Sequence, residues 1–499
     1  MSTRARNLLT PAAWVAAVTA ALLLLFPRGF PNYDTIYSLL WGREIAEGLS
    51  PDRGAALPPT PHPLSELFGA AVSPLGDGAI DVTMVIAYVV LGLIGYLVYR
   101  LGSLWFDRPI GAVAALIVLT RAPYLSNGLR AYIDLPYIAL VLAALVLETR
   151  RPRAGWPVLV LLAMAGLLRP EAWLFSFAYL AYLLLSPRDG DEATGIPLER
   201  ADTQNAGLIR PAFVRARGMP VALALTVAAP LLWAIFDWIT AGSPTYSFTG
   251  TRETVETLER QTGPVDLVLY GPRRLGEVLQ WPGMVGAAGG VALGLALLRR
   301  RSTIGVTAVV LALGAFAILA SAGLAIIPRY TMLAAAVLAV FAALALLGWR
   351  LLEPGCRWRR PWQAFAAVVA LMFVAWGPNQ YDLLHRVDAD LTNQRTIEED
   401  LRDLAASNAF EPLCLPISVP NHRAVPRLAW DVDVRPTDLV STSSEERQPR
   451  RGYFLDPANA FTVHNFILDP NDPARLQTPT PSGFRRVTAN DSWVLYRRC

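Results

Sequence analysis

Eleven separated stretches of apolar residues dominate the chain and limit what it can fold into. A helix needs about 17 to 25 apolar residues to cross a hydrocarbon core about 30 Å thick, and somewhat fewer where a bundle covers its ends. Hydrophobic residues make up 54% of the 499 residues and charged residues 17%, which excludes an ordinary soluble enzyme. The sequence therefore predicts a polytopic α-helical membrane protein. Its expected spans are residues 11–27, 80–99, 109–124, 134–148, 156–168, 171–186, 219–239, 282–298, 303–327, 330–348 and 362–377.

Arginine collects in alternate loops between these spans. Short cationic loops stay on the cytoplasmic side of a membrane, so the arginine-rich loops predict which loops face inward. On this basis the N-terminus lies inside, whereas the loops 28–79 and 240–281 and the segment 378–499 lie outside. The inward arginines are Arg4, Arg6, Arg100, Arg108, Arg150, Arg151, Arg153, Arg188, Arg200, Arg210, Arg215, Arg217, Arg299, Arg300, Arg301, Arg350, Arg357, Arg359 and Arg360.

The composition changes after residue 378. Long apolar runs give way to proline, asparagine and aspartate and to short strand-like pieces such as EPLCLPISV, GYFLDP and DSWVLYRRC. We expect residues 1–377 to form the membrane domain and residues 378–499 a small extracytoplasmic α/β domain, opened by the polar helix DLTNQRTIEEDLRDLAASN. Cys414 and Cys499 share the exported compartment, where disulfides persist, so they can pair with each other.

Several function classes have no support in the sequence. All 44 basic residues are arginine and the net charge is only +4, with no basic tract interleaved with aromatic residues. Nucleic-acid binding is therefore not expected. A glycine-rich phosphate loop is also absent from the sequence. The first apolar stretch lacks a small-residue cleavage site, so a cleavable signal peptide is not predicted.

Asp34 is a lone carboxylate directly after the first apolar stretch. One interpretation is the N-cap of the helix that follows it. That helix is amphipathic and is expected to lie on the outer membrane surface, with Tyr37 and Trp41 at headgroup depth. An acid at this boundary is also placed to take a proton from a hydroxyl group. The two roles are compatible.

Asp134, in LRAYIDLPY, lies at the outer end of the third and fourth spans. It can be the N-cap of a helix with Pro136 in its first turn, or a second carboxylate that orients an acceptor near Arg130. It can also share a divalent cation with Asp34 through oxygen ligands. His62, between two prolines in TPHPL, is a candidate metal ligand or acceptor contact, although a loop histidine is more often solvated.

Two arginines are candidates for binding a phosphate group. Arg169 and Glu171 interrupt an apolar stretch in GLLRPEAW, where ionisable residues usually face a cavity or each other. They can form a structural ion pair, or Arg169 can bind phosphate with its planar guanidinium. Arg329, in IPRYTM, is either an interfacial arginine that snorkels or a second phosphate ligand beside Tyr330.

In their order along the chain, these motifs resemble the GT-C superfamily of membrane glycosyltransferases, such as protein O-mannosyltransferases, aminoarabinose transferases and actinobacterial mannosyl- and arabinosyltransferases. The resemblance covers most of the chain: Asp34 after the first span, TPHPL, LRAYIDLPY, GLLRPEAW, IPRYTM and a soluble outer domain. One departure is the lack of a second acid next to Asp34. Protein mannosyltransferases have an Asp-Glu pair there, so this departure counts against protein mannosylation.

The resemblance implies a transferase in the bacterial inner membrane that moves a hexose or pentose from a polyprenyl-phosphate carrier to an envelope glycan, lipid or protein, with inversion. Asp34 would be the base, with Asp134 as a second catalytic acid. Arg169, Arg329 and Tyr330 would bind the donor phosphate; His62, Arg130 and Glu171 would be accessory; and Mg²⁺ or Mn²⁺ would be a possible cofactor. Nucleotide sugars are cytosolic, so they do not fit an outward site. The rival readings are a transporter or flippase, which would show an internal repeat and midplane charges, and a non-catalytic scaffold.

Overall fold

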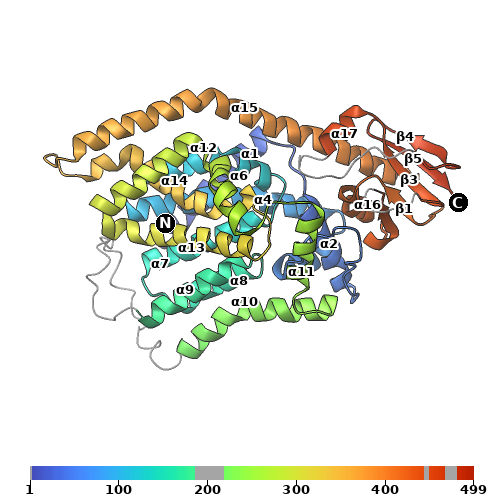
Figure 1. Cartoon of the computed structure of the whole chain (residues 1–499), viewed down its shortest axis with the longest axis horizontal. Helices are drawn as coiled ribbons and strands as arrows, with labels where there is room; N and C mark the ends of the chain where they lie inside the picture. Colours follow the sequence, from blue (N-terminus) through green and yellow to red (C-terminus); the bar gives the residue numbers. More distant parts are fainter. Residues whose placement is uncertain (1–2, 186–217, 443–448, 467–479) are drawn as a thin grey trace.

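The computed structural model describes residues 3–185, 218–442, 449–466 and 480–499, with side chains from residue 11 onward. Figure 1 shows a large helical body with a small sheet at one end. The helices are α1 (Thr3–Leu25), α2 (Tyr33–Ala46), α3 (Pro63–Val72), α4 (Gly78–Trp105), α5 (Arg108–Leu119), α6 (Ala122–Gly128), α7 (Asp134–Arg150), α8 (Trp156–Gly166), α9 (Glu171–Leu185), α10 (Gly218–Ala241), α11 (Tyr246–Thr257), α12 (Gly263–Leu297), α13 (Arg299–Ser321), α14 (Met332–Leu347), α15 (Arg359–Ala406), α16 (Val425–Val432) and α17 (Ala460–Phe466). The strands are β1 (Ile417–Val419), β2 (Leu439–Ser441), β3 (Gly452–Pro457), β4 (Arg485–Ala489) and β5 (Trp493–Arg498).

Each of the eleven apolar stretches is largely helical, but the stretch 109–124 is divided between α5 and α6, which are bent by 64°. Within the described residues, six helices are long and apolar enough to cross a membrane, or seven if the bent pair of α5 and α6 forms one span. The helices α8 and α9 are shorter, so the number of spans remains a prediction. The arginines from Arg188 to Arg217 lie outside the described residues, and the inward orientation of the N-terminus also remains a prediction.

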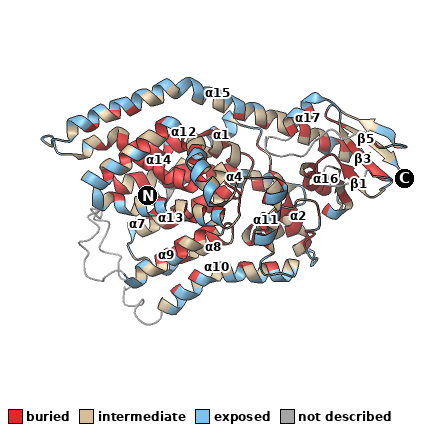
Figure 2. Ribbon diagram, viewed as in Figure 1, coloured by how far each residue is buried: buried red, intermediate tan, exposed pale blue. Residues whose placement is uncertain are grey.

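The centre of the helical body is the alanine-rich helix α14, nearly all of which is buried (Figure 2). Small residues let helix backbones approach closely where a membrane supplies no hydrophobic drive for association. Glycines of α12 let its backbone pack closely on the backbone of α14. A Cβ added at Gly290 would lie 1.9 Å from the carbonyl oxygen of Phe341, so only glycine fits there.

The last helix of the membrane domain differs from the prediction. The sequence indicates a span that ends at residue 377 and a separate polar helix after it, whereas α15 continues without a break to Ala406. Pro378 lies inside this helix, and α15 extends along the body to the sheet (Figure 1). The two predicted helices are therefore one rod that connects the two predicted domains.

The C-terminal region is a small α/β unit, as predicted. Its five strands have the order β2-β1-β3-β5-β4. The strand β1 pairs in parallel with β2 and β3, and β5 pairs antiparallel with β3 and β4. One apolar cluster joins this sheet to the end of α15 and to α2. The sheet therefore packs directly on the first loop of the membrane domain.

Burial of α2 contradicts the expected surface helix. Tyr37 is 0% exposed and Trp41 is 1% exposed, so neither side chain can lie among lipid headgroups. The indole nitrogen of Trp41 donates to the carbonyl of Asp52, at 2.8 Å. The apolar periodicity of α2 reflects packing against α3 and the C-terminal unit, which the sequence alone does not reveal.

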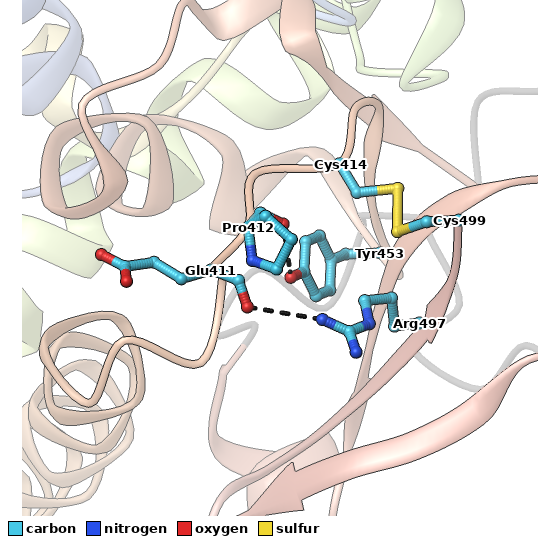
Figure 3. Close-up of a disulfide and its surroundings, with 6 residues drawn as sticks. All are labelled: Glu411, Pro412, Cys414, Tyr453, Arg497 and Cys499. Atoms are coloured by element: carbon cyan, nitrogen blue, oxygen red, sulfur yellow. Dashed lines mark hydrogen bonds between the residues drawn. A yellow bond between two sulfur atoms is a disulfide. The ribbon is translucent and has the colours of Figure 1, made fainter.

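Cys414 and Cys499 form a disulfide with a Cα–Cα distance of 6.2 Å (Figure 3). It ties the residue directly after β5 to the segment before β1, and Cys356 is free. We expect Cys414→Ser with Cys499→Ser to destabilise the C-terminal unit by up to about 4 to 5 kcal/mol, because the closed loop is long. Thermal unfolding measures this loss, with Cys356→Ser as the control. Alkylation without reductant should label Cys356 alone; labelling of Cys414 or Cys499 would contradict the pairing.

Candidate active site

Asp34 lies in the first turn of α2 and is not its N-cap. The N-cap is Asn32, whose side-chain oxygen accepts from the backbone N–H groups of Asp34 and Thr35 at 2.8 and 3.2 Å. The carboxylate of Asp34 is therefore free to turn outward from the helix end. It forms an ion pair with Arg329, at 3.1 Å between Oδ2 and Nη1, and both side chains are about four-fifths buried.

Arg329 and Tyr330 lie in a 3₁₀ turn just before α14. The guanidinium of Arg329 lies 5.4 Å from the ring centroid of Tyr330 and 5.5 Å from that of Tyr132. Within the described residues, Arg329 is ion-paired to Asp34. The buried Nε of Arg329 has no hydrogen-bond partner. Arg329 therefore keeps donor capacity for a further anion.

Arg169 is held between two carboxylates. Its Nη1 lies 3.3 Å from Asp134 and its Nη2 lies 2.9 Å from Glu171, and all three side chains are at most 6% exposed. The ring of Tyr330 packs on the guanidinium at 4.3 Å. Tyr330 thus lies against both arginines, and the motifs GLLRPEAW, LRAYIDLPY and IPRYTM meet at one place.

Asp134 does not cap α7, because the cap position is Ile133 and Asp134 is the first helical residue. Its carboxylate is directed to Arg169 and not to Arg130. The side chain of Arg130 binds Gln394 of α15 at 3.0 Å and lies over Phe30, so it is a link between α15 and the body. Arg130 is therefore not part of the Asp34 cluster.

His62 is buried beside this cluster, at the N-terminus of α3. Its ring packs edge-on against Trp233 at 5.7 Å, and its Nδ1 has no hydrogen-bond partner. Burial, together with the positive charge of Arg169, lowers the pKa of His62 to about 3. The imidazole is therefore neutral at physiological pH and is not the solvated loop histidine that its sequence context favours.

A cavity of about 590 Å³ adjoins the cluster. His62, Arg169, Glu171 and Tyr330 form part of its wall. The rest is mostly apolar and comes from α9, α10, α11 and α13, including Leu174, Phe177, Trp233, Phe248, Ile318 and Leu319. An apolar chamber with charged groups at one side suits an amphipathic ligand with an anionic end.

Comparison with known proteins gives a family profile for part of the chain and similar folds for nearly all of it. Residues 60–194 match a family profile described as dolichyl-phosphate-mannose-protein mannosyltransferase. The structure superposes on the crystal structure of ArnT from Cupriavidus metallidurans bound to undecaprenyl phosphate, over 99% of this chain and 98% of that chain, with 13% identity and a TM-score of 0.55. The chain therefore shares the fold of ArnT, which is the fold that the GT-C resemblance implies. No curated protein sequence gives a significant match.

A weaker similarity to this GT-C fold comes from AglB of Archaeoglobus fulgidus, an archaeal oligosaccharyltransferase in complex with an inhibitory peptide and a dolichol-phosphate. It has 14% identity and a TM-score of 0.45, over 87% of this chain and 64% of that chain. The similarity to ArnT confirms, at the level of the fold, the resemblance found in the sequence motifs. The roles of individual residues still depend on the geometry of this chain.

The electrostatic setting of Asp34 follows from its neighbours in the GT-C fold. Burial alone would raise the pKa of the Asp34 carboxyl group, but the charge of Arg329, with smaller effects of His62 and Arg423, outweighs burial and lowers it. Asp34 is therefore a carboxylate throughout the physiological range. Asp34 can act as a base only for a hydroxyl group that lies in direct hydrogen-bond contact with its carboxylate.

The predicted divalent cation is not supported by this geometry. Within the residues that the structure describes, no group of three His, Cys, Asp or Glu side chains can hold a metal ion. One oxygen of each carboxylate is ion-paired to an arginine, Asp34 Oδ2 to Arg329 and Asp134 Oδ1 to Arg169, so a divalent cation held by these two residues remains a prediction. The positive charge at the site of this GT-C fold is supplied by guanidinium groups.

Sequence reasoning missed two contributions to the site. The C-terminal unit places the ring of His422 against Tyr33 at 5.5 Å, and the charge of Arg423 reaches Asp34. A buried ion pair also joins Arg53 to Glu66, at 2.9 Å. In the sequence, Arg53, Glu66 and Arg423 appear only as charged residues of loops or short helices. Such residues are too common to be recognised as part of a site.

Proposed function

We propose that this protein is a glycosyltransferase that transfers a sugar from a polyprenyl-phosphate carrier to an envelope acceptor with inversion, on the extracytoplasmic side of a bacterial inner membrane. One observation carries the proposal. Arg169 and Tyr330 line a large apolar cavity, the ring of Tyr330 lies 4.3 Å from the guanidinium of Arg169 and 5.4 Å from that of Arg329, and Arg329 is ion-paired to Asp34. This arrangement fits a lipid phosphate beside a base.

The donor would place its isoprenoid chain in the apolar cavity and its phosphate near Arg329 and Arg169. A guanidinium group binds phosphate oxygens in a planar, bidentate geometry. Stabilising the negative charge that develops on the departing phosphate is the largest electrostatic demand of such a reaction. The arginines supply that charge without a metal ion.

Asp34 would then act as the general base. The acceptor hydroxyl attacks the anomeric carbon, its proton passes to the Asp34 carboxylate, and the bond from the anomeric carbon to the phosphate oxygen breaks. Because there is one displacement, the anomeric configuration inverts. In the free protein Arg329 holds Asp34, so a bound phosphate would draw Arg329 away and make Asp34 a stronger base.

Asp134 and Glu171 would act through Arg169. Both carboxylates bind its guanidinium, so they fix its orientation and compensate its buried charge. Asp134 is therefore assigned as a positioning residue for the phosphate ligand, and a direct contact with the acceptor is not part of this mechanism. His62 offers a neutral ring nitrogen to the cavity and would contact the sugar or the acceptor.

A transporter or flippase is the second reading of a membrane protein with a lipid-sized cavity. Transport predicts broken helices and charges at the bilayer midplane and an internal repeat. The charged cluster described above instead joins the first loop, the start of α7, the start of α9 and the turn before α14. These elements bring together groups for chemistry at one boundary of the body, which favours transfer.

Mass spectrometry of envelope glycans and lipid-linked sugars in a deletion strain tests the proposed function and names the sugar. We expect a polyprenyl-phosphate-linked sugar to accumulate while one envelope glycoconjugate loses the same sugar. Complementation with the wild-type chain should restore both. An unchanged glycan profile with mislocalised intact lipid-linked sugar would support a flippase and overturn the transferase.

The lowered pKa of Asp34 predicts the pH dependence of transfer. A base with a depressed pKa stays deprotonated down to acid pH, so kcat/KM should be flat through neutral pH and fall only below the ordinary carboxyl range, about pH 4. Arg329→Gln removes the charge that lowers this pKa, so the acid limb should move to higher pH. The exposed Arg273→Gln is the control. A wild-type limb at pH 6 to 7 would contradict the assignment.

A further inference from the structure

A second cavity, of about 370 Å³, lies next to the large one. It is enclosed by the proline-rich segment 55–61 of the first loop and by the helix α11. Thr60, Ser247 and Thr251 belong to the walls of both cavities, so the two spaces adjoin. Its volume falls in the range of about 300 to 1,000 Å³ that is typical of small-ligand sites.

Hydroxyl groups line this second cavity in place of the usual apolar residues. On α11, Thr251 and Thr254 each donate their hydroxyl proton to a backbone carbonyl one turn earlier, at 2.6 and 3.0 Å. The oxygen of each hydroxyl therefore keeps lone pairs that can accept from a ligand. Thr60 bonds Thr251 across the cavity wall at 2.5 Å.

The described wall of the cavity offers no unpaired positive charge. Arg53 and Glu253 are the charged residues of its described wall. The guanidinium of Arg53 is already neutralised by Glu66, yet its buried Nε has no hydrogen-bond partner. This nitrogen is fully buried, and the guanidinium lies over the ring of Trp41 at 4.5 Å, so Arg53 is held within the wall. Three proline rings, Pro58, Pro59 and Pro61, add apolar faces.

A hydrogen bond links the cavity wall to α2, the helix that carries the proposed base. The hydroxyl of Tyr33 donates to the carbonyl of Leu57, at 3.0 Å, and Leu57 lies in the cavity wall. Tyr33 directly precedes Asp34 in α2. A ligand in the second cavity would adjoin the proposed donor cavity through the wall residues that the two share, Thr60, Ser247 and Thr251.

We propose that this second cavity binds a neutral oligosaccharide, and that this sugar is the acceptor of the transfer. Hydroxyl and carbonyl oxygens match the hydroxyl donors of a sugar, and proline rings match its C–H faces, whereas a strongly anionic acceptor would find no free positive charge. The acceptor role rests on the proposed transferase function. Sugar binding by the cavity does not depend on it.

Gly250 allows a direct test, because it lines the second cavity and a Cβ added there meets no atom within 4 Å. Gly250→Phe should fill the cavity, whereas Gly250→Ala should leave it open. Gly276→Phe is the matched control: Gly276 also has open space at its Cβ and lies in α12, outside both cavity walls.

The full-length protein in nanodiscs would be examined by saturation-transfer NMR with maltose, cellobiose and mannobiose, and with glucose 6-phosphate as the anionic comparison. We expect at least one neutral disaccharide to bind, with affinity at least about tenfold weaker in Gly250→Phe and unchanged in Gly250→Ala and Gly276→Phe. The increase in melting temperature caused by undecaprenyl phosphate should persist in Gly250→Phe, which shows that the donor cavity is intact.

Three results would overturn the inference: no neutral disaccharide binding to the wild type, undiminished binding in Gly250→Phe, or stronger binding of glucose 6-phosphate. A Gly250→Phe protein that loses the undecaprenyl phosphate effect would also count against it, because the two cavities would not be separate sites. Sugar binding without any transfer from a lipid-linked donor would instead refute the proposed function and leave the carbohydrate site standing.

Discussion

Asp34→Asn should fold and insert normally but lose nearly all transfer, by about 10²- to 10⁴-fold. The amide keeps the shape of the carboxylate and can still accept a hydrogen bond from Arg329, but it cannot take a proton from a hydroxyl. The measurement is the rate of sugar transfer from a polyprenyl-phosphate donor, together with the melting temperature of the same preparation.

The control for Asp34→Asn is Asp403→Asn, a similar change at a side chain that is 72% exposed on α15. It should leave both the rate and the melting temperature unchanged. A well-folded Asp34→Asn protein with wild-type turnover would remove Asp34 from the base role. His62 would then be the group to test, since its Nδ1 is buried in the cluster without a partner.

The two arginines should respond differently to lysine. The two Nη atoms of Arg169 pair with Asp134 and Glu171, and a lysine ammonium group cannot reach both carboxylates. Arg169→Lys should therefore lower the free energy of unfolding by up to about 3 to 5 kcal/mol. Arg329 has one carboxylate partner, so Arg329→Lys should mainly weaken donor use, by about 10- to 100-fold for one lost charged hydrogen bond.

Melting temperature and the KM for the donor, measured on both variants, separate these effects. The conservative Arg273→Lys, at an arginine that is 70% exposed, is the reference. An Arg329→Lys protein with unchanged donor kinetics would leave the phosphate without its proposed ligand. If Arg169→Lys loses donor use without losing stability, Arg169 and not Arg329 is the main residue that binds the donor phosphate.

Much of the architecture could be predicted from hydropathy, because apolar runs of span length have few alternatives to helices. Each predicted span is largely helical, and the sheet lies where turn residues and short apolar runs indicate it. The break between Arg169 and Glu171, with Pro170 between them, was also visible as charges that interrupt an apolar stretch. These are local features, determined by residues close together in the chain.

The pairings across the site could not be predicted, because they depend on which helices are neighbours. Nothing local distinguishes Arg329 as the partner of Asp34, 295 residues away. The incorrect predictions also concern contacts between distant segments. Asp34 of α2 pairs with Arg329, Arg130 binds α15, and the C-terminal unit covers Tyr37. A helical periodicity shows which face is buried but not what buries it.

The central claim is that Asp34, Arg169 and Arg329 act on a polyprenyl-phosphate-linked sugar. It is tested most directly by single-turnover release of polyprenyl phosphate from a radiolabelled polyprenyl-phosphate sugar, with purified wild-type and Asp34→Asn protein and an envelope glycan fraction as acceptor. We predict stoichiometric release of polyprenyl phosphate with the label in the glycan for the wild type, and retained intact donor for Asp34→Asn. Intact donor with both proteins, or equal release by both, would contradict the account.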